Sequence, residues 1–423
     1  MNALAYCVGV AAAPRRFRLL VLSSDTFPPQ RVDVSVLFGE ELTGRGHKVD
    51  WILQSEAECH SAYRTDWGGG SVWVTPADRG HSLFRRLRKH ILGIWYDAKV
   101  FGLMRGDEYD AVEVKDKFLS AIFAWLAARL NRKRFVYWLS FPFPEFYLLK
   151  ARDRLGPYPM LYRIRGLAFK WLLYRLLLPA ADHVFVQSEQ MKRDIAAQGV
   201  PPEKLTAVPM GIKVQSLGMP ESAAMRTRIP PSERCFLYLG TLARERRIDF
   251  LLRVLVRVHA SMPEAKLYLV GKSEHPEDEE FLKQEAHRLG VFPSVRFVGQ
   301  LPQREAFQYV QDADACVSPF YPTPIFNSTS PTKLIEYMAM GKAVVANTHP
   351  EQNTLIQESG CGYCVPYDEQ AFAEAIVKLL TDPEKAREMG LRGRSYVIEH
   401  RAYGIIADLV EGQMNRVIEG ARA

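Results

Sequence analysis

A short segment in the second half of the chain groups side chains that could bind an anion. In NSTSPTKLIEYMAMGKAVVAN (327–347), four hydrogen-bond donors stand close together: Thr329, Ser330, Thr332 and Lys333. Ser330 is a favourable N-cap and Pro331 a favourable first helical residue, which predicts a helix that begins here. The unpaired amides and the positive dipole end of a first turn attract anions, and a Lys in that turn is unfavourable unless an anion lies nearby. The pattern predicts a phosphate-like site.

Lys333 also has a second interpretation. Glu336 lies three residues later on the same face, and such a pair stabilises a helix by about 0.2–0.5 kcal/mol. The residues alone leave the two interpretations even. Glu336 is a lone carboxylate on an apolar helix, so it is either solvated at the helix edge or accepts hydrogen bonds from two vicinal sugar hydroxyls. Gly341 is expected to end the helix as its C′ residue.

Two regions of alternating apolar strands and helical patterns must position these residues, as in parallel α/β units. The first region runs from RLLVLSS (18–24) to KLTAVPMGI (204–212), and the second runs from CFLYLG (235–240) to GYCVP (362–366). The segment between them loses the pattern and gains Pro, Ser and Met. The expected parts are an N-terminal Rossmann-like domain (1–213), a linker (214–233), a C-terminal Rossmann-like domain (234–400) and a C-terminal helix that packs back on the first domain (401–423).

The length and composition of the chain agree with this organisation. A chain of 423 residues is too long for one ordinary core, and 48% hydrophobic with 24% charged residues is typical of a globular protein. No apolar run is long enough to span a membrane. Six scattered Cys suit a reducing compartment, and the first basic residues follow the first apolar stretch, unlike a secretory signal. We therefore expect a cytoplasmic protein.

The net charge of +7 restricts the classes of partner. Such an excess suits nucleic acid, an anionic membrane surface or phosphorylated substrates. The sequence contains neither zinc-finger spacing nor an RNP-type aromatic strand, so no nucleic-acid partner is expected. The charge does not choose between the other two classes.

The segment 327–347 resembles the signature of the family 4, or group 1, glycosyltransferases. The resemblance implies the α/β GT-B fold, in which two Rossmann-like domains face a central cleft. Glu336 matches the second of two signature glutamates, which in the family binds the ribose hydroxyls of a nucleotide-sugar. The first glutamate would fall on Ser328, a departure from the pattern, and the SPTK variant here resembles a subgroup whose loop still cradles the donor.

A second stretch supports the resemblance. YLGTLARERRIDFLL (238–252) is similar to the family's loop that supplies basic residues to the diphosphate: Arg246 matches the usual Lys, and Arg247 is its neighbour. Thr241 stands where an Arg is common, and VRFVGQLP resembles the turn whose backbone contacts the base. The donor-binding residues that the resemblance implies are Thr241, Arg246, Arg247, Val298, Ser328, Thr329, Ser330, Thr332, Lys333 and Glu336.

The chemistry of such a site follows from the bond that breaks. Cleavage of a sugar–diphosphate bond creates an oxocarbenium-like sugar and an anionic leaving group. Arg246, Lys333 and the helix N-terminus would stabilise that charge without a metal or another cofactor. The resemblance implies retention of configuration.

The acceptor half offers weaker candidates. Ser140 stands near the place where family members often carry a His. Arg31 and Asp33 follow the first strand and could face the reacting sugar, which makes Asp33 the third catalytic candidate besides Arg246 and Lys333. For Asp33 and Glu145 the sequence favours the alternative, a solvated residue without a catalytic role.

Three other segments have competing interpretations. CGYC (361–364) lacks a second pair at zinc spacing, which favours free buried or half-buried Cys over a metal or redox site. In HSLFRRLRKHILGIW (81–95), a basic face opposes an apolar face. The basic face consists of Arg85, Arg86, Arg88 and Lys89. This helix is either a peripheral contact with an anionic membrane or an ordinary packed helix. GLAFKWLLYRLLLP (166–179) predicts a poorer membrane face, because its cations point all round the helix.

The sequence therefore predicts a glycosyltransferase that moves a sugar from a nucleotide-diphosphate sugar to a glycan or lipid-linked acceptor at the inner membrane face. Two rivals remain open. A sugar-nucleotide epimerase can share the architecture, and a non-catalytic nucleotide-sugar-binding partner would fit the substituted Ser328 and the absent His.

Overall fold

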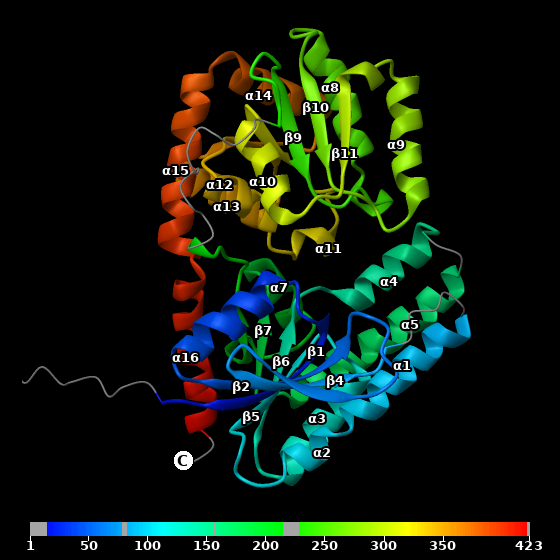
Figure 1. Cartoon of the computed structure of the whole chain (residues 1–423), viewed down its shortest axis with the longest axis vertical. Coiled ribbons are helices and arrows are strands. Elements are labelled where there is room, and N and C mark those ends of the chain that lie inside the picture. The colour runs from blue at the N-terminus through cyan, green and yellow to red at the C-terminus, as the bar shows by residue number, and fades with distance from the viewer. Residues whose placement is uncertain (1–14, 78–82, 156–157, 215–227, 421–423) are drawn as a thin grey trace, which may run out of the picture. The chain divides into compact units, whose positions relative to one another are not determined.

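The computed structural model describes residues 15–77, 83–155, 158–214 and 228–420 (Figure 1). Most of the predicted linker, residues 215–227, lies outside this described part. Two sheets with flanking helices confirm the predicted α/β class with two Rossmann-like domains.

The first sheet contains eight strands. They are β1 (Arg18–Phe27), β2 (Lys48–Ser55), β3 (Tyr63–Trp67), β4 (Gly70–Thr75), β5 (Ala111–Lys115), β6 (Arg134–Leu139), β7 (His183–Val186) and β8 (Leu205–Ala207). Their order is β3-β4-β2-β1-β5-β6-β7-β8. β1 runs parallel to both β2 and β5, and β3 is antiparallel to β4.

The helices of this half of the chain follow the strands in sequence. They are η1 (Asp33–Leu42), α1 (Leu83–Asp97), α2 (Val100–Leu103), α3 (Leu119–Leu130), α4 (Phe143–Arg152), α5 (Pro159–Leu172), η2 (Leu173–Leu177), α6 (Leu178–Ala180), α7 (Glu189–Ala196) and η3 (Pro202–Lys204). The alternation of strand and helix is what parallel strand pairs require, because each crossover must return to the same end of the sheet.

The second sheet contains six strands in the order β11-β10-β9-β12-β13-β14. They are β9 (Cys235–Leu239), β10 (Lys266–Val270), β11 (Val295–Gly299), β12 (Ala315–Ser318), β13 (Val344–Asn347) and β14 (Gly362–Val365). All their pairings are parallel.

The remaining helices are η5 (Arg244–Arg246), α8 (Asp249–His259), α9 (Pro276–Arg288), η6 (Phe292–Ser294), α10 (Gln303–Asp312), α11 (Pro324–Asn327), α12 (Thr332–Ala339), α13 (Pro350–Ser359), α14 (Glu369–Thr381), α15 (Pro383–Arg401) and α16 (Tyr403–Glu419). Helices α8 and α14 pack against each other over the second sheet, where the rings of Phe250 and Phe372 meet edge to face at 5.1 Å. Their burial anchors the core on which the loops of this sheet rest.

The described residues fall into two compact units. The first unit consists of the described residues within Met1–Val136, Ala181–His183 and Ala407–Ala423. The second consists of those within Tyr137–Ala180 and Val184–Ile406. Within the first unit, Arg45 Nη1 lies 2.6 Å from Asp408 and 2.7 Å from Glu411 of α16. The predicted domain borders at 213 and 234 stay a prediction.

β5 carries a carboxylate inside the core of the first unit. Glu113 is fully buried, and neither of its carboxylate oxygens has a hydrogen-bond partner within the described structure. Burial raises the pKa of Glu113 to about 8, although the nearby charge of Lys115 acts in the opposite direction. Glu113 is therefore protonated at neutral pH in the folded chain, whereas it is ionised in the unfolded chain.

This difference predicts a pH-dependent stability. Between the ordinary pKa of 4.5 and about 8, the folded state binds more protons than the unfolded state, so the free energy of unfolding falls as pH rises, by about 1.4 kcal/mol per pH unit. Glu113→Gln should remove that fall and make the protein more stable than the wild type at the alkaline end. Urea unfolding at several pH values measures it. Parallel pH profiles for the two proteins would contradict the assignment.

Candidate functional site

The two segments singled out in the sequence meet at one edge of the second sheet. Its strand order places β9 beside β12 and reverses there, since β10 and β11 lie to one side and β13 and β14 to the other. In open α/β sheets, ligands bind at the carboxyl ends of the strands at this kind of switch point. Residues 240–248 follow β9, and residues 319–331 follow β12. The structure thus brings Arg246 and Lys333 to a common edge of one sheet.

The backbone at this edge is fixed by buried contacts. The amide of Leu239, the last residue of β9, donates a 2.7 Å hydrogen bond to the hydroxyl of Tyr337 in α12. The amide of Gly240 donates to the carbonyl of Val270 at 2.9 Å. A Cβ on Gly271, which has a φ of 131°, would lie 2.0 Å from the carbonyl oxygen of Gly240. The loop after β9 therefore starts from a backbone frame that admits no side chain at this contact.

Two arginines of this loop lie over aromatic rings of the loop after β12. The guanidinium of Arg246 is 5.1 Å from the ring centre of Phe326, and that of Arg247 is 5.4 Å from the ring centre of Tyr321. Within the described part of the chain, neither guanidinium has a carboxylate partner. Rings hold a cation without neutralising it. The edge of the sheet therefore carries two positive charges that are free to compensate an anion.

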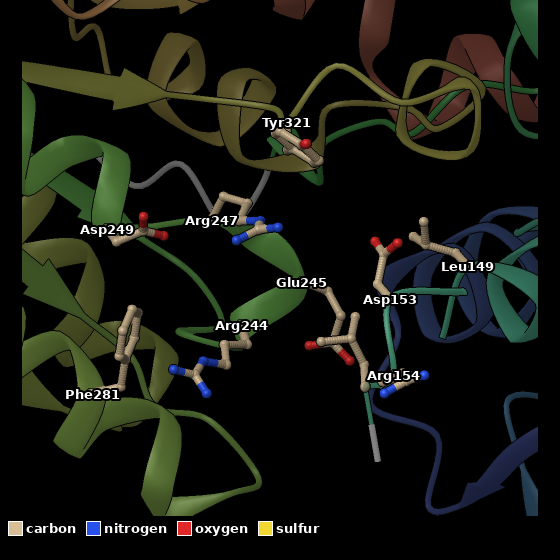
Figure 2. Close-up of a pocket in the computed structure, with 10 residues that line it drawn as sticks. Leu149, Asp153, Arg154, Arg244, Glu245, Arg247, Asp249, Phe281 and Tyr321 are labelled. Carbon is tan, nitrogen blue, oxygen red and sulfur yellow. The ribbon is translucent and has the colours of Figure 1, made fainter. Parts of the chain in front are cut away.

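Arg247 also has an unusual backbone. Its φ is 54°, in the left-handed region, where a residue with a Cβ is disfavoured by about 1 kcal/mol or more. Such conformations persist where the surrounding structure enforces them, and they concentrate at functional sites. The turn directs Arg247 toward Tyr321 (Figure 2).

Both arginines line cavities. Arg246 and Thr241 line a cavity of about 200 Å³, and Arg247 lines another of about 310 Å³ (Figure 2). The carboxylates around the second cavity are already paired with other cations. These pairs are Glu245 with Lys150 at 3.0 Å, Asp249 with Arg253 at 2.7 Å and Asp153 with Arg152 at 2.8 Å. The acidic side chains therefore leave Arg247 uncompensated.

Helix α12 begins differently from the sequence prediction. The helix starts at Thr332, Pro331 occupies the cap position, and no side chain caps it, so the prediction of Ser330 as N-cap is wrong. The Ser330 hydroxyl instead donates to Glu351 Oε1 at 2.9 Å and accepts from the amide of Met210 at 3.1 Å. A buried carboxylate without a hydrogen-bond donor costs more free energy than a helix start without a side-chain cap. The Ser330 hydroxyl is therefore directed at Glu351. The C-terminal prediction is confirmed, because Gly341 follows the helix with a φ of 69°.

The other hydroxyls of this loop also point inward. Ser328 donates to the Asp194 carboxylate, and Thr329 donates to the carbonyl of Phe326 at 2.7 Å. Ser188 adds a 2.7 Å hydrogen bond to the carbonyl of Ser328. These buried side chains hold the loop in shape, so a ligand at the helix start would meet the backbone amides rather than these hydroxyls.

Lys333 and Glu336 form the ion pair that one interpretation predicted. Lys333 Nζ lies 2.9 Å from Glu336 Oε2, and the Lys333 side chain is more exposed than that of Glu336. A half-exposed pair at this spacing contributes only a few tenths of a kcal/mol. Its two partners can therefore separate at small cost when a ligand offers each a better contact.

Glu351 is a member of the site region that sequence reasoning missed. It is almost fully buried, and Arg401 lies 2.9 Å from it. Burial raises the pKa of Glu351, and the charge of Arg401 and the hydrogen bond from Ser330 partly offset that rise. HPEQ (349–352) reads as an ordinary helix start, and nothing local indicates that Ser330 and Arg401 converge on it.

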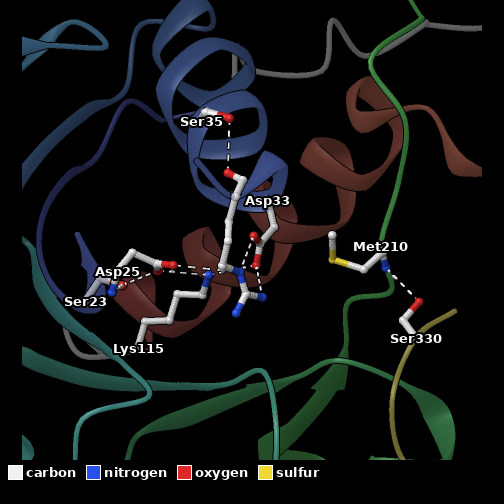
Figure 3. A network of polar contacts seen from close by, with 8 residues as sticks. Ser23, Asp25, Asp33, Ser35, Lys115, Met210 and Ser330 are labelled. Carbon is white, nitrogen blue, oxygen red and sulfur yellow. Dashed lines mark hydrogen bonds and ion pairs between the residues drawn. The ribbon is translucent and has the colours of Figure 1, made fainter. Parts of the chain in front are cut away.

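Two of the predicted acceptor residues, Arg31 and Asp33, lie in the first unit, and the switch point of the first sheet lies between β1 and β5. Figure 3 shows Asp33 beside Lys115. Asp33 is buried, at 2.7 Å from Lys115 Nζ and 2.9 Å from Arg31 Nη2. Burial alone would raise the pKa of Asp33, but the charges of Lys115 and Arg31 outweigh it and hold that pKa well below its ordinary value. Asp33 is not solvated, and a carboxylate so strongly ionised is a weak base.

Comparisons with known proteins agree with this geometry. The family model described as "Glycosyl transferases group 1" matches residues 233–382, and that described as "Glycosyl transferase 4-like domain" matches residues 36–211. The chain belongs to the group 1 glycosyltransferases.

Relatives of this glycosyltransferase chain include a phosphatidyl-myo-inositol mannosyltransferase of Mycobacterium leprae, 27% identical over 214 residues. That match covers 50% of this chain and 52% of the relative, so the chain spans about half the length of this curated relative. Sucrose-phosphate synthase from Thermosynechococcus elongatus superimposes with a TM-score of 0.71 and 22% identity, covering 96% of this chain and all of that one. Anabaena Alr3699/HepE, solved with UDP and glucose, gives a TM-score of 0.67 with 15% identity over 95% of this chain and 100% of that one. These likenesses show the GT-B fold.

Three further predicted residues lie in other elements than the arginines. Val298 is half-buried in β11, the edge strand of the second sheet. Ser140 is buried directly after β6. Glu145, in the first turn of α4, lies 3.5 Å from Lys170 Nζ of α5. Glu145 is therefore half-buried and paired rather than solvated, and its catalytic role stays a prediction.

Two predictions about other chemistry can be compared with the structure. Cys361 is buried and Cys364 is half-buried, and both are free thiols, as the sequence favoured. Among residues 15–77, 83–155, 158–214 and 228–420, no group of three His, Cys, Asp or Glu side chains lies close enough to hold a metal ion. None of the described helices is long and apolar enough to cross a membrane.

The inward hydrogen bonds of the loop before α12 predict a stability effect. Ser330→Ala removes the acceptor of the Met210 amide and the hydroxyl donor of buried Glu351, and such losses cost about 1–3 kcal/mol each. Thr354→Ala, which removes an exposed hydroxyl bonded within its own helix, serves as the control. Thermal melting should fall markedly for Ser330→Ala alone. Equal melting temperatures for the two variants would show that Ser330 does not hold the loop.

Proposed function

We propose that this protein is a retaining glycosyltransferase that moves a sugar from a nucleotide-diphosphate sugar to a glycan or lipid-linked acceptor, in the synthesis of surface polysaccharide or glycolipid. One observation carries the proposal. Arg246 and Arg247 stand uncompensated at the switch point of the second sheet, where α12 also begins. A diphosphate is the part of a nucleotide-sugar that needs both positive charge and helix-start amides.

The donor would be distributed over this edge of the sheet. Arg246 and Lys333 contact the diphosphate together with the first-turn amides of α12, and Glu336 accepts hydrogen bonds from the ribose hydroxyls. The Lys333–Glu336 pair exchanges its internal contact for these two contacts with the ligand. The segment 328–332 supplies backbone groups, and the base lies toward Val298. The UDP bound to the Anabaena protein of the same fold supports a nucleotide donor.

The reaction follows from the placement of charge. As the bond between the sugar and the diphosphate breaks, negative charge grows on the leaving phosphate oxygen. Arg246 and the helix dipole are already oriented, and Lys333 is placed once it has exchanged Glu336 for the bound donor, so all three stabilise this charge as it develops, and the proposal requires no metal. Asp33, held by the buried Lys115, would orient the partly exposed Arg31 toward the acceptor rather than accept a proton itself.

A lipid-linked or membrane-proximal acceptor is part of the proposal. The mannosyltransferase of Mycobacterium leprae is named for a phosphatidylinositol acceptor, and the net charge of +7 suits the anionic inner face of a cytoplasmic membrane. Helix α1 is the surface that the sequence proposes for such a contact. Arg88 is exposed there, whereas the side chains of Arg85 and Arg86 lie outside the described residues.

The first experiment is a panel of nucleotide-sugars tested for thermal stabilisation, followed by assays of the best donor. Stabilisation with transfer to an added acceptor, or slow hydrolysis of the donor, supports the proposal. Conversion of one nucleotide-sugar into another without acceptor would assign the protein to the epimerases. Binding without turnover would assign it to the non-catalytic partners.

The two basic residues should affect turnover more than stability. Arg246→Met and Lys333→Met remove charge from the leaving group, and each should lower donor turnover by about a hundredfold. Arg257→Met, an exposed arginine of α8, is the control. Activity is measured beside the melting temperature of each variant. A variant with a lowered melting temperature but normal donor turnover would show that the residue has a structural role instead.

Glu336 should determine the affinity for the donor. Glu336→Gln leaves the shape of the side chain but weakens two charge-assisted hydrogen bonds to the ribose, so donor affinity should fall about tenfold or more. Calorimetric titration with the best nucleotide-sugar measures this loss, and Glu374→Gln on the exposed face of α14 should titrate like the wild type. Undiminished affinity in Glu336→Gln would remove Glu336 from the donor site.

A further inference from the structure

Helix α5 exposes a continuous row of large apolar side chains. We call this row the outer stripe: Met160 (69% exposed), Leu161 (57%), Ile164 (57%), Leu167 (53%) and Trp171 (65%). Residues 160, 164, 167 and 171 follow the spacing of a single helix face, and Leu161 lies beside them. Single exposed apolar residues are ordinary on a folded protein, but five on one face mark an interaction surface.

Helix α5 already has a packed face that is separate from the outer stripe. The opposite face of α5 packs on α4, and the two helices lie side by side (Figure 1). Gly166 makes their approach close, because a Cβ at this position would lie 2.8 Å from Leu148 Cγ. Arg165 covers the rings of Tyr147 and Phe169 on this packed side. The helix therefore has a buried face of its own, and the stripe is not needed for packing within the described structure.

The charges around the stripe indicate the chemistry of its partner. Residues 159–180 contain four cations and no Asp or Glu: Arg163, Arg165, Lys170 and Arg175. Arg163 and Arg175 are exposed, and neither has a carboxylate partner among the described side chains. Lys170 lies 3.5 Å from Glu145, toward α4. On a helical projection, Arg163 borders the stripe and Arg175 lies one turn beyond Trp171. The apolar face is thus flanked by positive charge alone.

We propose that the outer stripe docks the protein on an anionic lipid surface, with α5 lying in the plane of the membrane interface. The apolar side chains enter the boundary between headgroups and acyl chains, where a Trp is favoured, and the arginines reach the lipid phosphates. A second copy of the chain is a poorer occupant, because a symmetric contact would bring the same cations together. The docking is independent of the proposed sugar transfer.

This placement differs from the expectation for residues 166–179. That segment starts after Met160, Leu161 and Ile164, so it omits three of the five residues of the stripe. Its second half lies in η2 and α6, where Leu173, Leu177 and Leu178 are buried. The sequence treated α5, η2 and α6 as one regular helix, and only on that single helix do the cations of the segment point all round.

Vesicle flotation with the full chain tests the proposal. The wild type should float with vesicles of phosphatidylcholine and phosphatidylglycerol and much less with phosphatidylcholine alone, and its recovery should fall with added salt. The double variant Ile164→Glu, Trp171→Glu should reduce binding about tenfold or more. The double variant Val256→Glu, Leu391→Glu adds the same charge at exposed apolar positions of α8 and α15 and should bind like the wild type. Because all four side chains are exposed, melting temperatures should remain close to that of the wild type.

The charge on α5 provides a second variant. Arg163→Ser with Arg175→Ser should weaken binding to the anionic vesicles, by about fivefold for each cation removed, and should reduce its dependence on salt. The apolar stripe remains intact in this variant, so residual binding separates the two contributions.

Helix α1 allows a matched comparison. Ile91 and Trp95 are exposed by 56% and 68%, and they repeat the residue types of the α5 variant. Three results would overturn the proposal. The first is full flotation of the α5 double variant, whatever the result for Ile91→Glu, Trp95→Glu, and the second is equal recovery of the wild type on neutral and anionic vesicles. The third is the formation of concentration-dependent dimers that the α5 substitutions abolish, which would assign the stripe to a second copy. Loss of binding in the α5 variant supports it, whether or not α1 contributes as well.

Discussion

The hydrogen bond between the amide of Leu239 and the hydroxyl of Tyr337 fixes the geometry on which the candidate donor site depends. Leu239 is the last residue of β9, and Tyr337 is fully buried in α12. The bond therefore connects the start of the loop after β9 to α12, the helix that follows the loop after β12. A buried hydroxyl without this partner would cost about 1–3 kcal/mol, which favours a single placement of α12. The arginines after β9 and the first turn of α12 are therefore presented together, and neither needs a ligand to find its position.

Electrostatic compensation separates the parts of the chain that hold the fold from those that can receive a ligand. Inside the first unit, the carboxylates of Asp33 and Asp25 neutralise Lys115 and Arg31. In the second unit, Glu351 is paired with Arg401. Arg246 and Arg247 rest instead on Phe326 and Tyr321, which keep a guanidinium in place and leave its charge available. The difference lies in the type of partner, not in the number of charges. It explains why Arg401 is structural, whereas Arg246 and Arg247 of the same unit are proposed for ligand contact.

The sequence predicts what depends on local pattern and on the rules of parallel sheets. Apolar runs such as that of β9 are recognisable, and Gly341 ends α12 as expected. The carboxyl ends of β9 and β12, which are neighbouring parallel strands of the sheet, bring Arg246 and Lys333 to one edge. The direction of a side chain is not predictable in this way when its partner is distant in the sequence. Ser330 has the local signature of a cap, worth about 1 kcal/mol, but Glu351 competes for its hydroxyl with the larger demand of a buried carboxylate. Asp33 reads as a loop residue until Lys115, 82 positions later, is placed beside it.

The close approach of Gly240 and Gly271 has a consequence for how such a loop can diversify. The contact is made by backbone alone and tolerates no side chain at Gly271, so the position of the loop is set independently of the residues that it displays. Thr241, Arg244 and Arg247 are exposed beyond this anchor. Substitutions among them can change which chemical groups the edge of the sheet presents while its scaffold is inherited intact. A lineage could therefore change the ligand that this edge accepts through side chains alone, without passing through unfolded ancestors.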